Sequence, residues 1–344
     1  MSNPEPSGRL PTAVVFGVAG VTLAAEERRF LRDADPLGFI LMQRNCRDPQ
    51  QVRALVLELR ATVGRAVPVL IDQEGGRVAR MKPPHWRAAP AAARFGELAQ
   101  RDRAAGLEAC RLNARLLAAE LAPLGVSVNC LPVLDLSLPE THKAIGDRAY
   151  AADPMLVAAL GRAAADGLIE GGVLPVIKHM PGHGRATVDS HHDLPVVTTA
   201  AAVLEATDFA AFRANADLPW GMTAHVVYKA IDALPATVSP TAISRVIRGS
   251  IGFGGFLISD DLGMKALPGG FADRAQAALA AGCDAVLHCS GDMGEMAEVM
   301  AGVRRLTDES GRRLAAGAQC IAPAASVEMA GLVRRLERLL AVAA

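Results

Sequence analysis

The 344-residue sequence has few aromatic residues and no surplus of charge of either sign. Aromatic side chains make up 4% of it, and 36 Lys and Arg residues balance 36 Asp and Glu residues. This balance lacks the basic footprint typical of proteins that bind nucleic acid or an anionic membrane surface. The apolar content of 51% consists mostly of Ala, Leu and Val, which suits many packed helices and argues against a disordered chain.

Long apolar runs and paired cysteines are also missing. No run of about 18 uncharged apolar residues occurs, so the sequence does not predict a membrane span. Residues 1–11 lack the basic-then-apolar pattern of a signal peptide, and we expect them to be flexible. The six cysteines show neither a C-x-x-C motif nor a regular spacing, which is typical of reduced thiols. We therefore expect a cytoplasmic protein without a membrane or nucleic-acid partner.

Short apolar, β-branched runs recur along the chain, separated by amphipathic stretches rich in Ala, Leu and Arg. The runs lie at 12–20, 38–45, 67–76, 126–135, 174–184, 220–228, 255–261 and 284–291. Continuous rather than alternating apolar runs indicate strands covered on both faces, as in a parallel sheet. Helices are predicted at 48–64, 103–125, 153–172 and 240–252. Two of them open with Asp-Pro, an N-cap followed by proline at the first helical position.

This alternation favours an α/β fold with a single (β/α)₈ barrel of the TIM type over residues 1–344, although a doubly wound sheet alternates in the same way. We expect long βα loops at the C-terminal face, where such barrels build their active sites. Residues from about 291 to 344 are predicted to be mostly helical and to pack on the barrel. The last helix repeats leucines at helical spacing, which would also suit a dimer contact, so we expect a monomer or a weak dimer. These leucines are Leu332, Leu336, Leu339 and Leu340.

Charged and polar side chains gather where the predicted strands end, which is the active-site end of a barrel. They are Arg44, Asp72, Asp135, Lys178, His179, His225, Asp260 and Asp261. The run IDQEGGRVAR (71–80) places two acids before paired glycines, which allow a sharp turn. Asp72 could accept from two neighbouring hydroxyls, and the planar fork of Arg80 suits an oxygen-rich ligand. The alternative is a surface turn with ordinary ion pairs.

The run KHMPGHGRATVDSHHDLP (178–195) holds four of the eight histidines. In extended backbone Asp189 and His191 would point to the same side, so that the carboxylate orients the imidazole for proton transfer near neutral pH. A polar surface loop is a second interpretation. A metal site is a third, but an H-x-x-x-H spacing across a Pro-Gly pair is not the helical pair of zinc motifs. Its ligands would come from His179, His183, His191 and His192.

The run GFLISDDLGM (255–264) ends a predicted strand with two adjacent carboxylates. They point to opposite faces of an extended strand, so we expect at most one of them to aim directly at the pocket. Aspartate can act as a covalent nucleophile toward a sugar. Asp260 is the candidate for that role, and Asp261 is interpreted as a helix N-cap.

Together these runs, with GFILMQRN (38–45) and IGDRAY (145–150), resemble the N-acetyl-β-glucosaminidases of glycoside hydrolase family 3 that recycle peptidoglycan. The resemblance covers roughly residues 12–290 in the family's order, and the K-H-x-P-G-H-G…D-S-H run is its most specific part. It implies that Asp260 is the nucleophile and that His191, oriented by Asp189, is the general acid/base. It implies a single barrel without metal or cofactor. The residues implied to bind the substrate sugar are Asp72, Arg80, Arg148, Lys178 and His179.

The reaction implied by this resemblance is a retaining hydrolysis that removes terminal β-linked N-acetylglucosamine from muropeptides. The expected substrate is N-acetylglucosamine on 1,6-anhydro-N-acetylmuramic acid, with or without its peptide. Three alternatives stay open. They are another family 3 β-glycosidase, such as a glucosidase or xylosidase, a metal-dependent hydrolase, and a non-catalytic sugar-binding barrel.

Overall fold

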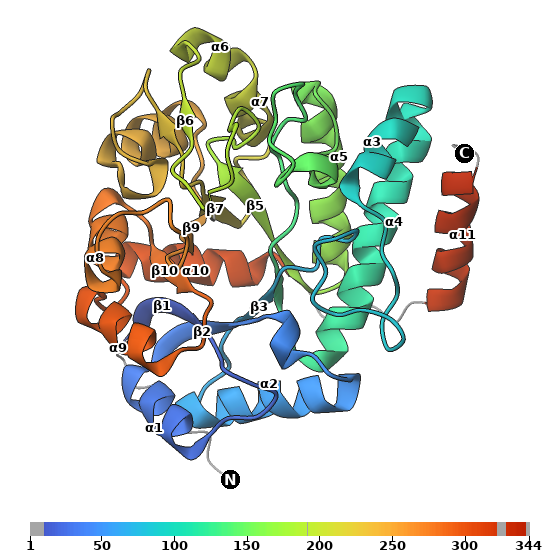
Figure 1. Ribbon diagram of the computed structural model, residues 1–344. Coiled ribbons are helices and arrows are strands. Elements are labelled where there is room, and N and C mark those ends of the chain that lie inside the picture. The colour runs from blue at the N-terminus through green and yellow to red at the C-terminus, as the bar shows by residue number, and fades with distance from the viewer. Residues whose placement is uncertain (1–9, 191, 322–327, 342–344) are drawn as a thin grey trace.

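The computed structural model describes residues 10–190, 192–321 and 328–341. Its centre is a closed barrel of parallel strands in the order β1-β10-β9-β7-β5-β4-β3-β2 (Figure 1). The strands are β1 (Thr12–Gly17), β2 (Pro36–Leu41), β3 (Val69–Ile71), β4 (Val128–Asn129), β5 (Leu174–Met180), β7 (Trp220–Thr223), β9 (Phe256–Asp261) and β10 (Ala285–His288). Each overlaps one predicted run, and the predicted TIM-type barrel is confirmed.

Helices surround the barrel on its outside (Figure 1). They are α1 (Ala25–Ala34), α2 (Pro49–Val63), α3 (Ala92–Arg101), α4 (Arg103–Leu121), α5 (Pro154–Glu170), α6 (Ala201–Ala206), α7 (Asp208–Arg213), η5 (Ala242–Ser250), α8 (Phe271–Ala281), α9 (Met293–Gly302), α10 (Asp308–Gln319) and α11 (Met329–Ala341); short 3₁₀ turns are η1 (Gln43–Asn45), η2 (Ala122–Leu124), η3 (Gly146–Arg148) and η4 (Ala236–Val238). The Asp-Pro starts of α2 and α5 are N-caps as predicted, because Asp48 and Asp153 accept backbone N–H groups of the first turn.

The strands are buried on both faces, as their continuous apolar runs predicted. Every residue of β1, β2, β5 and β10 is buried. Fully burying one such aliphatic or aromatic side chain stabilises a fold by roughly 1.5–3 kcal/mol. The barrel therefore forms a stiff frame whose strand ends are fixed in position.

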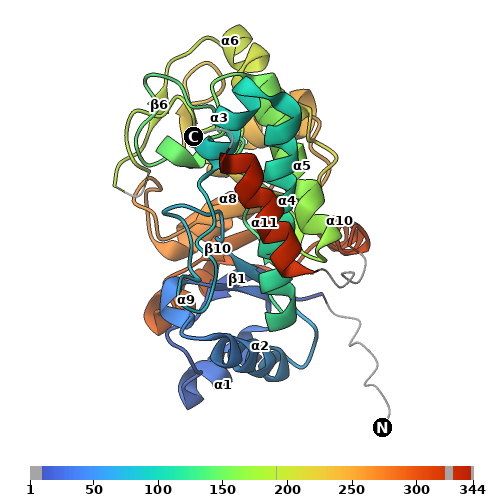
Figure 2. The same ribbon diagram turned by 90° about the vertical axis from the view of Figure 1, so that its right-hand side faces the viewer.

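The C-terminal helix α11 lies along α4 (Figure 2). Leu336 is buried in this contact, and Arg335 forms an ion pair with Glu108 of α4. The other leucines of its repeat are partly buried against the core. The apolar face of α11 thus packs on its own chain.

Part of the predicted flexible segment 1–11 is anchored. Residues 1–9 lie outside the described residues, but the carbonyl of Leu10 accepts from Arg305 at 2.6 Å. The carbonyl of Pro11 accepts from the N–H of Leu306 at 2.9 Å. These bonds hold Leu10 and Pro11 beside residues 305 and 306, immediately before β1 begins.

A second, two-stranded sheet was not predicted. In it β6 (Val196–Val197) runs parallel to β8 (Val227–Tyr228). Two residues are too short for a periodicity to show in the sequence. The carbonyl of Pro195 accepts from the N–H of Val227 at 2.9 Å, so the sheet fixes the end of the 178–195 run beside the segment after β7.

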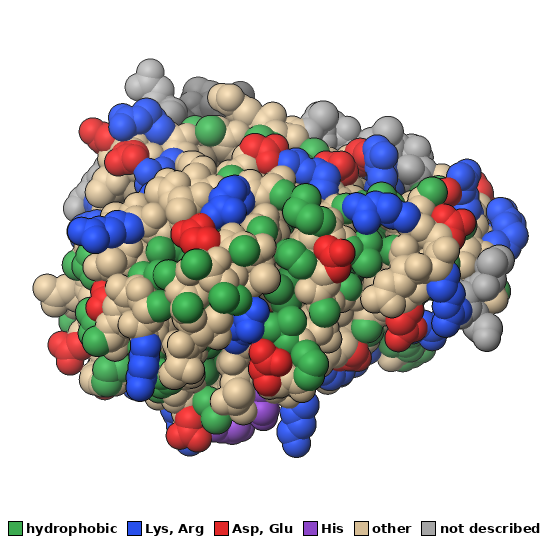
Figure 3. All heavy atoms as spheres, turned by 90° about the horizontal axis from the view of Figure 1, so that it is seen from above, with side chains coloured by type: hydrophobic (Ala, Val, Ile, Leu, Met, Phe, Trp, Pro, Cys, Tyr) green, Lys and Arg blue, Asp and Glu red, His purple; other side chains and the backbone are tan. Residues whose placement is uncertain are grey.

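The face of the molecule seen in Figure 3 has no large area of one charge among its described residues. Acidic and basic side chains alternate over the face shown in Figure 3. In the part of the chain that the structure describes, no helix is long and apolar enough to cross a membrane.

Candidate active site

A pocket of about 260 Å³ lies where the barrel strands end. Its walls come from the ends of β5, β7, β9 and β10 and from the segments that follow β2, β3, β4, β5, β9 and β10. His191 lies outside the described residues, and the other residues predicted for the site all line this pocket. They are Asp72, Arg80, Arg148, Lys178, His179, Asp189 and Asp260.

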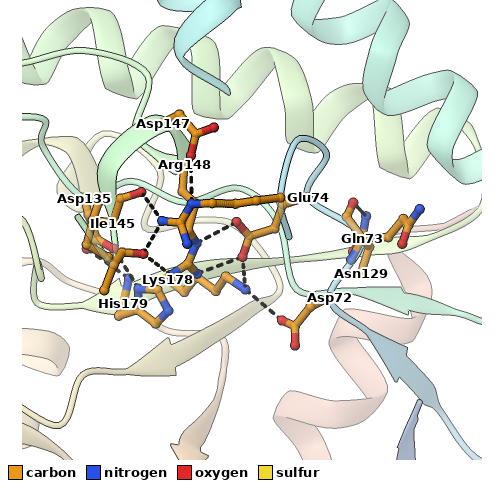
Figure 4. Close-up of polar contacts among 12 residues, drawn as sticks. Asp72, Gln73, Glu74, Asn129, Asp135, Ile145, Asp147, Arg148, Lys178 and His179 are labelled. Carbon is orange, nitrogen blue, oxygen red and sulfur yellow. Dashed lines mark hydrogen bonds and ion pairs between the residues drawn. The ribbon is translucent and has the colours of Figure 1, made fainter. Parts of the chain in front are cut away.

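Lys178 is the centre of a buried ion cluster. Its side chain is 2% exposed, and its Nζ lies 2.8 Å from Asp72 Oδ1 and 2.7 Å from Glu74 Oε1 (Figure 4). Arg148 donates Nε and Nη2 to the two oxygens of Glu74 at 2.9 and 2.8 Å, a bidentate pair. Arg80 Nη2 donates to Asp72 Oδ2 at 2.9 Å. Two carboxylates thus hold three cations together at one side of the pocket.

The charges of this cluster stabilise one another. Burial raises the pKa of Glu74, but the charges of Arg148 and Lys178 outweigh it and lower that pKa to about 2. The pKa of Asp72 is lowered for the same reason, with burial opposed by Lys178 and Arg80. Burial lowers the pKa of Lys178, whereas Asp72 and Glu74 raise it above its ordinary value. All three groups are therefore charged at neutral pH, as buried ions are when they are paired.

A tight turn aims the two acids of this cluster. The N–H groups of Glu74 and Gly75 both donate to the carbonyl of Val78, at 2.9 and 3.1 Å. Gly75 has φ +105°, and a Cβ there would lie 2.2 Å from the carbonyl oxygen of Pro90. Only glycine fits this position. Glu74 was noted in the sequence as one of two acids in this run but was given no role, although it is the most enclosed carboxylate of the cluster.

Asp135 lies behind His179. It is 0% exposed, and its Oδ2 lies 2.7 Å from His179 Nδ1. Its Oδ1 accepts the N–H groups of His179 and His183 at 3.2 and 2.6 Å. Burial raises the pKa of Asp135, but His179 and the hydrogen bonds outweigh it, so that the pKa falls to about 2. The ionised carboxylate of Asp135 therefore accepts a hydrogen bond from the ring of His179, which lines the pocket.

Asp260 and Asp261 end β9, and both line the pocket. That at most one of the two side chains aims directly at the pocket stays a prediction. Ala285 of β10 pairs with Ile258, and Leu287 pairs with Asp261, so β9 has one extra residue in this interval. Such a bulge breaks the alternation of side chains and turns one of them to the other face.

The two acids differ in their hydrogen bonds. Asp260 Oδ1 accepts the N–H of Asp261 at 2.8 Å. Burial raises the pKa of Asp260, but His179 and His225 lead the influences that lower it below its ordinary value. Asp261 Oδ1 accepts the N–H groups of Gly263 and Cys289 at 3.0 and 3.1 Å. Asp261 thus closes a turn, and the predicted helix N-cap is wrong, because the next helix, α8, begins only at residue 271.

The chain turns at Asp189, so the extended backbone expected there is wrong. The carbonyl of Asp189 accepts the N–H groups of His192 and Asp193 at 2.9 and 3.0 Å. Ser190 is 5% exposed, and its Oγ lies 3.2 Å from His183 Nε2. The carbonyl of Ser190 also accepts the N–H of Ala266 at 3.3 Å. This turn is therefore docked on the pocket wall through Ser190.

Two of the four histidines considered as metal ligands have other partners. His179 Nδ1 contacts Asp135, and His183 Nε2 contacts Ser190. Burial lowers the pKa of His183 to about 4, so this ring is neutral near pH 7. Among the residues that the structure describes, no three His, Cys, Asp or Glu side chains are arranged to hold a metal ion.

Known proteins share both the sequence and the fold. The model of the glycosyl hydrolase family 3 N-terminal domain matches residues 13–319. A beta-hexosaminidase of Bordetella avium is 40% identical over 290 residues, which cover 83% of each chain. A beta-hexosaminidase of Alkalilimnicola ehrlichii is 41% identical over 281 residues, or 80% of each chain.

Among solved structures, NagZ from Neisseria gonorrhoeae in complex with N-trifluoroacetyl-D-glucosamine is 31% identical. The two align with a TM-score of 0.85 over 98% of this chain and 99% of that chain. The resemblance drawn from the sequence motifs is confirmed, and the chain belongs to glycoside hydrolase family 3.

Proposed function

We propose that the protein is a retaining β-N-acetylhexosaminidase that removes terminal β-linked N-acetylglucosamine from cell-wall muropeptides. The observation that carries this proposal is Asp260, a partly buried carboxylate with a lowered pKa that lines a pocket rich in charged side chains. The beta-hexosaminidases among the relatives, and the glucosamine derivative bound to the Neisseria protein, support a hexosamine substrate. The muropeptide, N-acetylglucosamine on 1,6-anhydro-N-acetylmuramic acid with or without peptide, is the substrate that the sequence motifs predicted.

The first step forms a covalent sugar–enzyme bond. The Asp260 carboxylate attacks the anomeric carbon through an oxocarbenium-like transition state, and the bond to the glycosidic oxygen breaks. Its lowered pKa keeps Asp260 ionised and therefore nucleophilic near neutral pH. His191, in its protonated form, gives its proton to the departing oxygen.

The second step releases the sugar. Neutral His191 removes a proton from water, and the oxygen of that water attacks the anomeric carbon and frees Asp260. Asp189, which lines the pocket two residues earlier in the chain, orients this histidine. General acid/base catalysis of this kind contributes roughly 10²–10⁴-fold to the rate.

The ion cluster binds the hydroxyl and N-acetyl groups of the sugar. Lys178, Arg80 and Arg148 supply donors, and Asp72 supplies an acceptor that two cations already hold in place. His179 completes this set from the pocket floor. The site works without a cofactor, inside a single catalytic domain to which the C-terminal helices belong. Six free cysteines are consistent with a cytoplasmic enzyme of peptidoglycan recycling.

Trapping the intermediate tests the nucleophile. A 2,4-dinitrophenyl N-acetyl-β-glucosaminide fluorinated on the ring should form the covalent bond faster than water breaks it. Mass spectrometry of a proteolytic digest should then find the added sugar on Asp260. The Asp261→Asn variant is the matched control and should still be labelled. A label on Asp261 of the wild type would overturn the assignment.

The leaving group tests the acid. His191→Ala should lose about 10²–10⁴-fold on a poor leaving group and much less on a dinitrophenyl glycoside, which departs without a proton. Equal losses on both substrates would rule out an acid role for His191. Rates on nitrophenyl glucoside and xyloside separate the other family 3 activities, and a loss of activity in EDTA would favour a metal-dependent hydrolase.

A further inference from the structure

The sugar pocket contains an Asp–His pair that is separate from the Asp189–His191 pair of the proposed mechanism. It consists of Asp135, just after β4, and His179 in β5. Their 2.7 Å contact joins a carboxylate that is 0% exposed to a ring that lines the pocket. The sequence motifs give Asp135 no role, and the proposed mechanism uses no proton from it.

We propose that Asp135 is a positioning residue: its carboxylate holds His179 Nδ1 as an N–H donor and so presents Nε2 of that ring to the sugar beside Asp260. This inference rests on the proposed function, because it deepens the role of a sugar-binding residue. Asp135 acts only through His179.

The ring tautomer is determined by its partner. An ionised carboxylate only accepts hydrogen bonds, so the His179 nitrogen that faces it must carry a proton. The 2.7 Å distance is that of a charge-assisted hydrogen bond. Nε2 bonds to none of the described residues, and it is left to accept from, or donate to, a ligand hydroxyl.

The backbone fixes the carboxylate in turn. The second oxygen of Asp135 accepts the N–H of His179 at 3.2 Å and the N–H of His183 at 2.6 Å. The carboxylate is therefore held by the same segment whose ring it orients. Neither His179 nor Asp135 can turn without breaking a buried hydrogen bond and leaving a buried polar group unpaired.

The charges around the pair make its effect measurable at the nucleophile. Asp135 faces His179, His183 and, at longer range, Arg148 and Tyr228. His179 in turn acts on Asp260, where it is the leading influence that lowers the carboxyl pKa. The other side chains that lower the pKa of Asp260, His225 and Lys178, do not contact Asp135.

The Asp135→Asn variant isolates this role. The amide oxygen can keep both backbone N–H groups, while the amide nitrogen replaces the oxygen that faces His179. That nitrogen is a donor, so the ring must present a bare Nδ1 and carry its proton on Nε2. The variant therefore inverts the tautomer and keeps the shape of the side chain.

A matched control is Asp284→Asn. Asp284 is also buried, with 5% exposure, and its carboxylate pairs with Arg248 and Arg313 just before β10. It lies at the opposite end of the strand from the pocket. This variant reports the cost of losing a buried carboxylate without touching the sugar site.

Two readouts decide the proposal. In ¹⁵N-histidine NMR spectra the wild type should show a His179 Nδ1–H, assigned by its loss in His179→Gln, and Asp135→Asn should show the proton on Nε2. In kinetics, Asp135→Asn should lower kcat/KM about 10- to 100-fold, the worth of one charge-assisted hydrogen bond. It should also shift the acidic limb of the kcat/KM profile, because Asp260 then faces a ring with the other tautomer. Asp284→Asn should keep the wild-type limb.

A wild-type His179 with an unprotonated Nδ1 would overturn the proposal, and so would a folded Asp135→Asn with an unchanged acidic limb. If that variant does not fold, the spectra of the wild type and His179→Gln still decide. Failure of the wild type to hydrolyse any N-acetylglucosaminide would refute the proposed function. The tautomer of His179 would then still show whether Asp135 orients the ring.

Discussion

Glu74 offers a sharp test of the ion cluster, because its carboxylate contacts two cations, the buried Lys178 and the partly buried Arg148. Its side chain is 5% exposed and bonds to both Arg148 and Lys178. The Glu74→Gln substitution keeps the size of the side chain and one acceptor oxygen but removes the charge. Asp72 would then be the only carboxylate facing Lys178, Arg80 and Arg148 in this cluster.

The expected loss of stability follows from the pKa of Glu74. That pKa lies at about 2 in the folded protein, against an ordinary value of 4.5. At about 1.4 kcal/mol per pH unit, the difference corresponds to about 3 kcal/mol of stabilisation at neutral pH. Removing one partner of a buried ion pair costs about 3–5 kcal/mol in other proteins, which agrees.

The pH dependence of this loss has a definite sign. The folded state lowers the pKa of Glu74, so its contribution is complete above about pH 4.5 and is lost as the pH falls toward 2. The difference in unfolding free energy between wild type and Glu74→Gln should therefore be about 3 kcal/mol at pH 7. It should shrink as the pH falls below about 5.

Urea denaturation followed by circular dichroism, at several pH values between 7 and 4, measures this difference. Glu120→Gln is the control of opposite sign, because burial raises the pKa of Glu120 despite its contact with Arg87. Removing that charge should leave stability unchanged or slightly higher at pH 7. Equal stability of Glu74→Gln and wild type at pH 7, or a difference that does not change with pH, would refute the reasoning.

Three further substitutions test the turn at Asp189, the C-terminal helix and an N-cap. Ser190→Ala removes the contact with His183 Nε2, which is worth about 1 kcal/mol. It should slow the turnover of substrates with poor leaving groups about fivefold and change the turnover of dinitrophenyl glycosides less. An equal effect on both substrates would contradict a role in acid catalysis. Leu336→Ala should lower the unfolding free energy by about 2–5 kcal/mol, since this leucine of α11 is 3% exposed and packs on the core. No change in thermal denaturation would mean that α11 contributes little to the stability of the fold. Asp48→Ala removes the N-cap of α2 and should cost about 1 kcal/mol by the same measurement, with Asp48→Asn retaining most of it.

The barrel could be predicted because its strands follow a local rule. Runs such as 12–20 and 284–291 are continuously apolar, and both faces of these strands are covered. The first charged residues at the end of each apolar run mark the end of the strand. This rule predicted that Asp72, Lys178 and Asp260 lie at the same end of the barrel. The resemblance to the family then assigned roles in sugar binding and catalysis to these positions.

The sequence could not show the contacts that depend on register and backbone turns. The bulge in β9 that brings both Asp260 and Asp261 to the pocket depends on pairing with β10, more than 20 residues away. The turn at Asp189 replaces an extended backbone, because Ser190 is held by His183 of the same run and by Ala266 of another segment. Asp135 was visible only as a strand-end acid, since its partner His179 is 44 positions away in the sequence.

The cluster and the Asp135–His179 pair lead to the same conclusion about binding. Lys178 and Arg148 are already held by carboxylates, and the ring of His179 is already oriented, before any sugar enters. Groups that are fixed in advance lose little conformational entropy on binding, so more of each hydrogen bond appears as affinity. The same pairing prevents isolated charges in a buried pocket, which would otherwise destabilise the barrel by several kcal/mol each. Glu74→Gln should therefore lower both the unfolding free energy and the affinity for the sugar. Asp135→Asn and Asp284→Asn should lose a comparable amount of stability, but Asp135→Asn should lose more catalytic activity.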